Sequence, residues 1–237
     1  MFSSVLVLAL AGIVAFIVIK GKSTAVSDPL KNIPADVAFL LRINDFSGLS
    51  GNTFKNNKVF TTLKNITPFK NLYADIEAID SLTGINVDVL SVLKKCRLYI
   101  SSHYIGGRKT EFLFIFENFK GGSDRQVYDI VSEITKQPVK DSERKYEGKS
   151  IFTLKVIRKN KPQSFYFSLV EGNLLLSRSV ILIENAIRQS SMPASLPGND
   201  EFARILTTAG KNKEVNLFIN MRKFNGIISS LANNQYS

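Results

Sequence analysis

The sequence predicts an α+β fold: a largely antiparallel sheet built from hairpins, with helices packed on one face, preceded by one N-terminal transmembrane helix. Three observations lead to this prediction. Strand-like segments follow one another in pairs joined by short turns, which is typical of antiparallel sheets. The stretches between them carry apolar residues at helical spacing. The segment from Met1 to Ile19 contains no charged side chain.

The N-terminal segment has the length and composition of a membrane-spanning helix. As a helix, its uncharged part would extend about 28 Å, close to the thickness of a hydrocarbon core. Only a helix satisfies all backbone groups of a single segment within lipid. We therefore expect residues 1–22 to form a membrane anchor, ended by Lys20 and Lys22. The apolar side chains expected to face lipid are Val5, Leu6, Val7, Leu8, Leu10, Ile13, Val14, Phe16, Ile17, Val18 and Ile19.

A cleaved signal peptide is the alternative interpretation of this segment. The small residues at 23–25 would suit cleavage, but no basic side chain precedes the apolar run, which favours a retained signal anchor. The side of the membrane is open to two interpretations. Because basic residues tend to stay cytoplasmic, Lys20 and Lys22 favour a cytoplasmic body. The family resemblance described below favours an exported one.

The rest of the chain divides into a polar tether, 23–32, and a single α+β domain, 33–237. A first strand is predicted over 37–43. Hairpins are predicted from 98–105 with 111–116, 139–146 with 151–157, and 164–170 with 174–176, with 158–162 as a charged turn. Helical spacing predicts helices over 59–66, near 76–79, over 87–93, from Ser123 to Ile134, over 180–188 and over 202–209.

The strand over 111–116 is apolar on both sides. Phe112, Phe114 and Phe116 alternate with Leu113 and Ile115, so each face of the strand presents large apolar groups. Strands of this composition lie in the centre of a sheet, with both faces covered. We therefore expect this strand to be central.

Segments 37–49 and 215–227 resemble each other. Val, Phe and Gly recur at matching positions, and both segments are predicted to form a strand, a polar corner and the approach to a helix. Internal similarity of this kind can mark a repeat. Residues 215–237 would then either complete the first unit or begin a second, truncated one. Chance similarity between two strands is the alternative explanation.

Charge and composition limit the possible functions. The formal net charge is +11, which favours anionic surfaces such as lipid headgroups or polymers, although a solvated basic surface is the preferred explanation. The chain has one cysteine, Cys96, and one histidine, His103. A disulfide partner is therefore not required, and we expect no metal site and no cofactor. The neighbouring basic residues could activate Cys96, but a buried structural thiol is expected.

Two short motifs resemble those of a known family. Ile33-Pro-Ala-Asp36 leads into the first strand, and Phe165-Tyr-Phe is followed by Gly172-Asn-Leu-Leu-Leu-Ser177 and then a helix. In these features the sequence resembles a family of membrane-anchored bacterial envelope proteins of unknown function. The resemblance implies an exported, periplasmic domain beside the membrane, and longer relatives would fit a truncated chain. It supplies no catalytic residues.

The sequence contains no strong catalytic motif. His103 would have to act as the base of any Ser–His–Asp site, and no Gly-x-Ser-x-Gly elbow is present. Gly121-Gly122-Ser123 could bind an anion at a helix start, but helix capping explains it. The alternating aromatics lack a ribonucleoprotein signature, so no nucleic acid partner is expected. We therefore expect no catalytic residues.

These observations favour a non-enzymatic membrane protein of the cell envelope, a scaffold or interaction module that contacts the membrane and other envelope proteins. Two alternatives remain. One is a basic module that docks on anionic lipid or cell-wall polymer. The other is an atypical hydrolase that uses His103.

Overall fold

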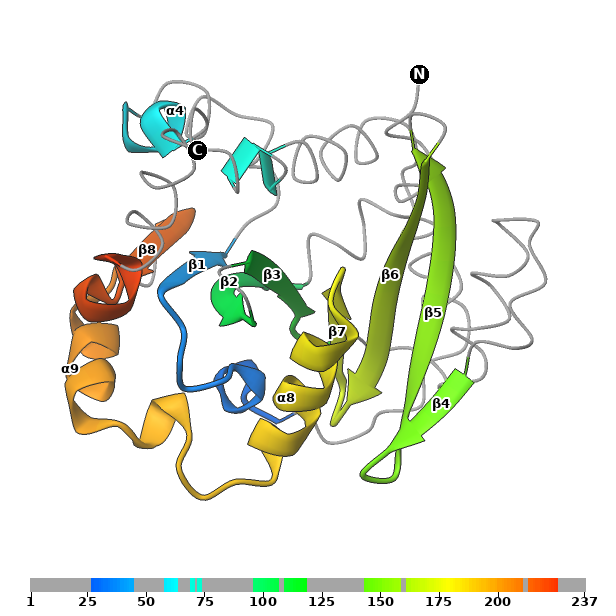
Figure 1. Cartoon of the computed structure of the whole chain (residues 1–237). Helices are drawn as coiled ribbons and strands as arrows, with labels where there is room; N and C mark the ends of the chain where they lie inside the picture. Colours follow the sequence, from blue (N-terminus) through cyan, green and yellow to red (C-terminus); the bar gives the residue numbers. More distant parts are fainter. Residues whose placement is uncertain are drawn as a thin grey trace.

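The described part of the chain forms one antiparallel sheet. In a computed structural model, the described residues are 27–44, 58–63, 69–70, 72–73, 96–106, 109–118, 143–158, 161–210 and 213–225. Their eight strands follow the order β4-β5-β6-β7-β3-β2-β1-β8 (Figure 1). All pairs of neighbouring strands in this sheet are antiparallel. The predicted α+β class and antiparallel sheet are confirmed.

The predicted strands, and those predicted helices that the structure describes, lie close to their predicted positions, whereas η1, inside the predicted tether, and η2 were not predicted. The strands are β1 (Phe39–Ile43), β2 (Leu98–Ile105), β3 (Lys109–Phe116), β4 (Glu143–Tyr146), β5 (Lys149–Arg158), β6 (Lys161–Val170), β7 (Asn173–Ser177) and β8 (Val215–Ile219). The helices are η1 (Pro29–Asn32), α4 (Lys58–Leu63), α8 (Val180–Ser190), η2 (Leu196–Gly198) and α9 (Asp200–Thr208). Residues 69–70, 72–73 and 221–225 are also helical.

Turn chemistry explains two of the hairpins. Glu147 and Gly148 both have positive φ, and so do Glu171 and Gly172. A two-residue turn of this type matches the right-handed twist of the strands that it joins. The predicted charged turn over 158–162 was too long. The ladder continues to the pair Arg158 and Lys161, because cross-strand hydrogen bonding extends both strands into the charged segment.

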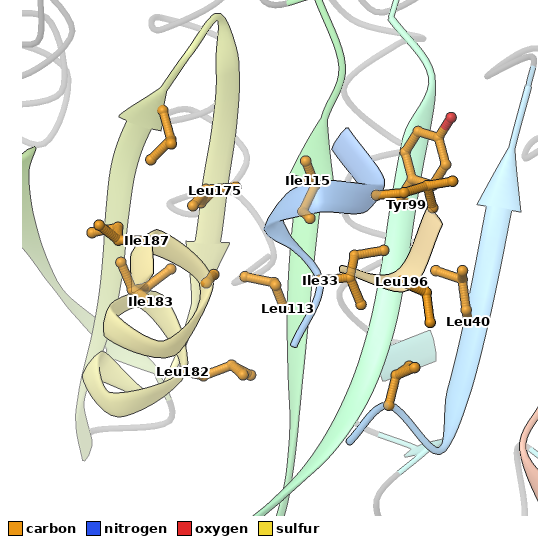
Figure 2. Packing of buried hydrophobic residues seen from close by; sticks show 14 of the residues in the cluster. Ile33, Leu40, Tyr99, Leu113, Ile115, Leu175, Leu182, Ile183, Ile187 and Leu196 are labelled. Atoms are coloured by element: carbon orange, nitrogen blue, oxygen red, sulfur yellow. The ribbon is translucent and has the colours of Figure 1, made fainter. Parts of the chain in front are cut away.

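One face of the sheet, here called the α8 face, is covered by η1, η2 and α8. Figure 2 shows the side chains of Leu182, Ile183 and Ile187 from α8, together with Ile33 and Leu196, lying over the strands. Their partners on the sheet include Leu40, Tyr99, Leu113, Ile115 and Leu175. Ser179 caps α8 by accepting a hydrogen bond from the backbone of Leu182. The helices on this face therefore bury the alternate residues of β1, β2, β3 and β7.

The opposite face, here called the Phe69 face, is also covered, so the prediction of helices on one face only was wrong. The ring of Phe69, which is 1% exposed, lies 5.4 Å from the ring of Phe39 and 5.7 Å from that of Phe112. Phe224, from helical residues 221–225, lies 6.5 Å from Phe69. The physical reason is the composition of the central strands, whose apolar side chains on both faces must be removed from water.

Strand β8 pairs with β1 in the same sheet. The register places Leu41 beside Leu217 and Phe39 beside Ile219. The two similar segments thus begin as neighbouring antiparallel strands. The boundaries of a second repeat stay a prediction, because residues 226–237 lie outside the described part of the chain.

Several other predictions also concern residues that the structure does not describe. These are the anchor at 1–22, the helices near 76–79, over 87–93 and over 123–134, and the Gly121-Gly122-Ser123 segment. Within the described ranges, no helix combines the length and apolar character needed to span a bilayer.

Candidate functional site

His103 lies in β2 between a serine and an aspartate. Its Nδ1 atom is 2.9 Å from Oδ1 of Asp36, and its Nε2 atom is 2.8 Å from Oγ of Ser101. Ser101 precedes His103 by two residues on the same strand, so both side chains project from the same face. Asp36 comes from the turn between η1 and β1. The three residues, here called the His103 relay, form a continuous chain of polar contacts.

The protonation pattern of the relay follows from Asp36. The hydrogen bond with His103 lowers the pKa of Asp36, with a smaller contribution from Lys223, while burial opposes the shift. The ionised carboxylate can only accept, so Nδ1–H of His103 donates to it. In a neutral imidazole, Nε2 then accepts a hydrogen bond from the hydroxyl of Ser101. Ser–His–Asp hydrolases use the same pattern of atoms.

The relay is enclosed by the protein. Ser101 and His103 are each 1% exposed, whereas the side chain of Asp36 is 49% exposed. In the sheet, Ser101 lies between Leu40 of β1 and Leu113 of β3, both buried. A nucleophilic serine must reach its substrate, and this hydroxyl is surrounded by core. In this conformation the relay is a buried polar link between the turn at Asp36 and strand β2.

Further charged groups lie near His103. Glu111 of β3 is its cross-strand partner, is largely buried and forms an ion pair with Lys109. Together with Asp36, these groups place two acids close to one imidazole, and the contact between Lys109 and Glu111 offsets part of the negative charge. The relay therefore lies within a mixed-charge cluster at one end of the sheet.

The lowered pKa of Asp36 predicts a pH dependence of stability. Its folded-state pKa lies below the ordinary value of 3.8, so the stabilisation is fully present above that value and is lost as pH falls through the folded-state pKa. Because the carboxylate is half exposed, we expect a contribution below about 1 kcal/mol. Urea unfolding between pH 3 and 7 should show wild type more stable than Asp36→Asn at neutral pH, with the difference shrinking below about pH 4. A constant difference over this range would contradict the assignment.

The edge strand β8 presents a second candidate site. Hydrogen bonds from the backbone N–H of Asn44 to the carbonyl of Glu214, and from that of Asn220 to the carbonyl of Ala38, flank the ladder with β1. Narrow and wide pairs alternate in an antiparallel ladder, so residues 216 and 218 also bond toward β1. The N–H and C=O groups of Val215, Leu217 and Ile219 then point away from the sheet. No described strand lies beyond this edge.

The two edges of the sheet differ in charge. At the opposite edge, β4 exposes Glu143, Arg144 and Lys145. Charged side chains on an edge strand discourage pairing with other chains. Strand β8 has the sequence Val-Asn-Leu-Phe-Ile and carries no charge. By this criterion, β4 is a protected edge, whereas β8 lacks charged protection.

Apolar side chains near β8 add to this difference. Helix α9 contains no buried residue, yet Phe202, Ile205 and Leu206 recur at helical spacing. The ring of Phe202 packs 5.6 Å from that of Phe218 on β8. The apolar side chains of Ile205, Ile219 and Met221 are 51%, 40% and 62% exposed. This region, here called the β8 edge, comprises β8, α9 and residues 220–223.

Comparison with protein-family models, with curated proteins and with solved structures finds no match. The resemblance to anchored envelope proteins therefore stays a prediction. Functional arguments for this chain depend on its own geometry.

His103 was a candidate on sequence grounds, but neither of its partners was. Asp36 was noted only within the Ile33-Pro-Ala-Asp36 motif, and Ser101 lay without comment inside the strand predicted over 98–105. The two-residue spacing of Ser101 and His103 was the one available signal, because it places both side chains on one face. Cys96 is buried as expected, and burial raises the pKa of its thiol to about 12. Among the described residues, no group of three or more His, Cys, Asp or Glu side chains could hold a metal ion.

Proposed function

We propose that this chain is a non-enzymatic, membrane-anchored protein of the cell envelope that binds another protein through its β8 edge. The observation that supports this most directly is the contrast between the sheet edges. Strand β4 is charged, whereas β8 is uncharged and directs the backbone groups of Val215, Leu217 and Ile219 outward. Unpaired edge groups of this kind are templates for strand addition.

The anchor and its sidedness belong to the same proposal. Residues 1–22 would hold the chain in the membrane, and the body would lie on the periplasmic side. The apolar N-terminal sequence supports an anchor, and the resemblance to envelope proteins supports export. Protease added to intact spheroplasts should digest the body, whereas a protected body would place it in the cytoplasm.

A pair of proline variants tests the interaction role. Leu217→Pro removes an outward-pointing N–H while leaving the hydrogen bonds from residues 216 and 218 to β1 available. Lys145→Pro is the matched control at the other edge. The two-residue turn at 147–148 makes Tyr146 and Lys149 a hydrogen-bonded pair. The backbone N–H of the next residue, Lys145, therefore points away from the sheet.

Both variants would be purified as full chains from detergent-solubilised membranes, and co-purifying proteins identified by mass. We expect partners that accompany wild type and Lys145→Pro to be lost with Leu217→Pro. Retention of every partner by Leu217→Pro would remove the β8 edge from the proposal. Circular dichroism of each variant checks that the sheet is intact.

A Ser–His–Asp hydrolase is the second candidate. It is favoured by one observation, the placement of Asp36 on Nδ1 and Ser101 on Nε2 of His103. A fluorophosphonate probe that labels an activated serine decides between the two. Labelling of wild type that disappears in Ser101→Ala and His103→Ala would favour the hydrolase. Absence of labelling agrees with the burial of Ser101.

A further inference from the structure

We propose that the β8 edge takes an extended peptide segment with an apolar centre and acidic flanks, which adds to the sheet beside β8. This inference rests on the proposed interaction role of that edge and goes further by naming the chemical class of its partner. Its parts are the backbone groups, the side chains on each face and the charges at the two ends of β8.

The backbone groups determine the shape of the partner. Val215, Leu217 and Ile219 each direct one N–H and one C=O outward, at the spacing of alternate residues. Only an extended backbone offers acceptors and donors at the same spacing, so the occupant is a strand and not a helix or a small molecule. Pairing with β1 already fixes β8 in an extended conformation.

The side chains beside the edge determine the centre of the partner. Phe218 projects to the α8 face, beside Phe202 of α9. Leu217, the partner of Leu41, projects to the Phe69 face. A strand added here would therefore have apolar neighbours on both faces, with Ile219 exposed at its end. Apolar or β-branched side chains in the centre of the partner fit this environment.

Charge determines the flanks of the partner and disfavours a second copy of this chain. Lys213 precedes β8, and Arg222 and Lys223 follow it, all three exposed. Glu214 is the acid beside Lys213, and Asp36 lies close enough to Lys223 to feel its charge, so each end of the strand has one nearby acid and the basic excess lies at the far end with Arg222. The chain as a whole carries a formal net charge of +11, so two copies repel each other, whereas an acidic segment is attracted.

The test uses the full chain in detergent and a fluorescent peptide in which Val and Thr alternate between two pairs of Asp. The comparison peptide has Lys in place of every Asp. Fluorescence anisotropy should show binding of the acidic peptide and at least about tenfold weaker binding of the basic one. Affinity for the acidic peptide should fall severalfold as ionic strength rises from about 0.01 M to 0.15 M, because the Debye screening length shortens from about 30 Å to about 8 Å.

Four variants locate the binding. Leu217→Pro should weaken binding about tenfold through the lost edge hydrogen bond, and Lys145→Pro should leave it unchanged. Ile219→Asp and Ile219→Lys place opposite charges at the same exposed position and should respectively weaken and preserve binding of the acidic peptide. This second pair decides the matter if Leu217→Pro fails to fold.

Several results would overturn the inference. If both peptides bind equally, or if binding is insensitive to both Leu217→Pro and Ile219→Asp, an acidic strand is not the occupant of the β8 edge. If sedimentation shows that the wild-type chain is a dimer and that Leu217→Pro is a monomer, the β8 edge binds a second copy of this chain. Binding to phosphatidylglycerol vesicles that the peptide does not inhibit assigns the basic charge to lipid. If membrane partners depend on Leu217 while the acidic peptide does not bind, this inference fails and the proposed function stands.

Discussion

Replacing Phe69 with alanine is expected to destabilise the protein by about 3–5 kcal/mol. The ring is 1% exposed and packs against Phe39 and Phe112 of the sheet and against Phe224. Its removal would leave a cavity between three aromatic side chains that belong to separate segments, and these cannot all move inward to fill it. For a chain of this size, the midpoint of thermal unfolding should fall by roughly 10 °C.

Two controls accompany this prediction. Phe69→Leu retains most of the apolar volume and should cost about 1 kcal/mol. Ile181→Ala removes an apolar side chain that is 51% exposed, and should change stability by less than about 0.5 kcal/mol. The measurement is urea unfolding of the full chain in a mild detergent. If Phe69→Ala behaved like Ile181→Ala, the Phe69 face would not be packed as described.

The second large effect is expected at His103. His103→Ala should destabilise the protein by about 3 kcal/mol, because it opens a cavity and leaves the buried hydroxyl of Ser101 without its acceptor. Ser101→Ala should cost less, about 1 kcal/mol, because it removes a smaller group. The contact between them predicts that the double variant is more stable than the sum of the single effects implies, by about 1 kcal/mol.

This cycle separates a structural role from a catalytic one. A structural relay predicts stability losses in both single variants and no loss of any esterase activity. If His103→Ala kept the stability of wild type, the relay would not stabilise the fold. Its buried placement would then have no structural explanation.

Local sequence signals predicted most of the sheet correctly. The Glu-Gly pairs at 147–148 and 171–172 occupy two-residue turns with positive φ, and turns of this type are marked by local sequence, so the hairpins could be placed from the sequence. The alternation of Phe112, Leu113 and Phe114 predicted a strand covered on both faces, and all three are buried. The same alternation also implies that helices cover both faces of the sheet, which the prediction of helices on one face did not take into account.

The candidate sites depended on contacts between distant parts of the chain. Asp36 and His103 are 67 residues apart, and no local pattern in the sequence links them. Likewise, the similarity of 37–49 to 215–227 did not show that their first strands pair, or that β8 would be an edge strand. Such pairings depend on the packing of the whole sheet, in which many strand orders satisfy the same local preferences.

By itself, the sequence determined the positions of the hairpins, the buried alternation of the central strands, the helix α8 and the basic net charge. Each depends on turn chemistry, side-chain periodicity or composition within a short stretch of chain. Only the tertiary structure decided that Ser101, His103 and Asp36 meet, that Phe69 covers the second face, and that β8 is an uncharged edge while β4 is a charged one. These features depend on which strands become neighbours, and that is determined by the burial of apolar surface over the whole domain.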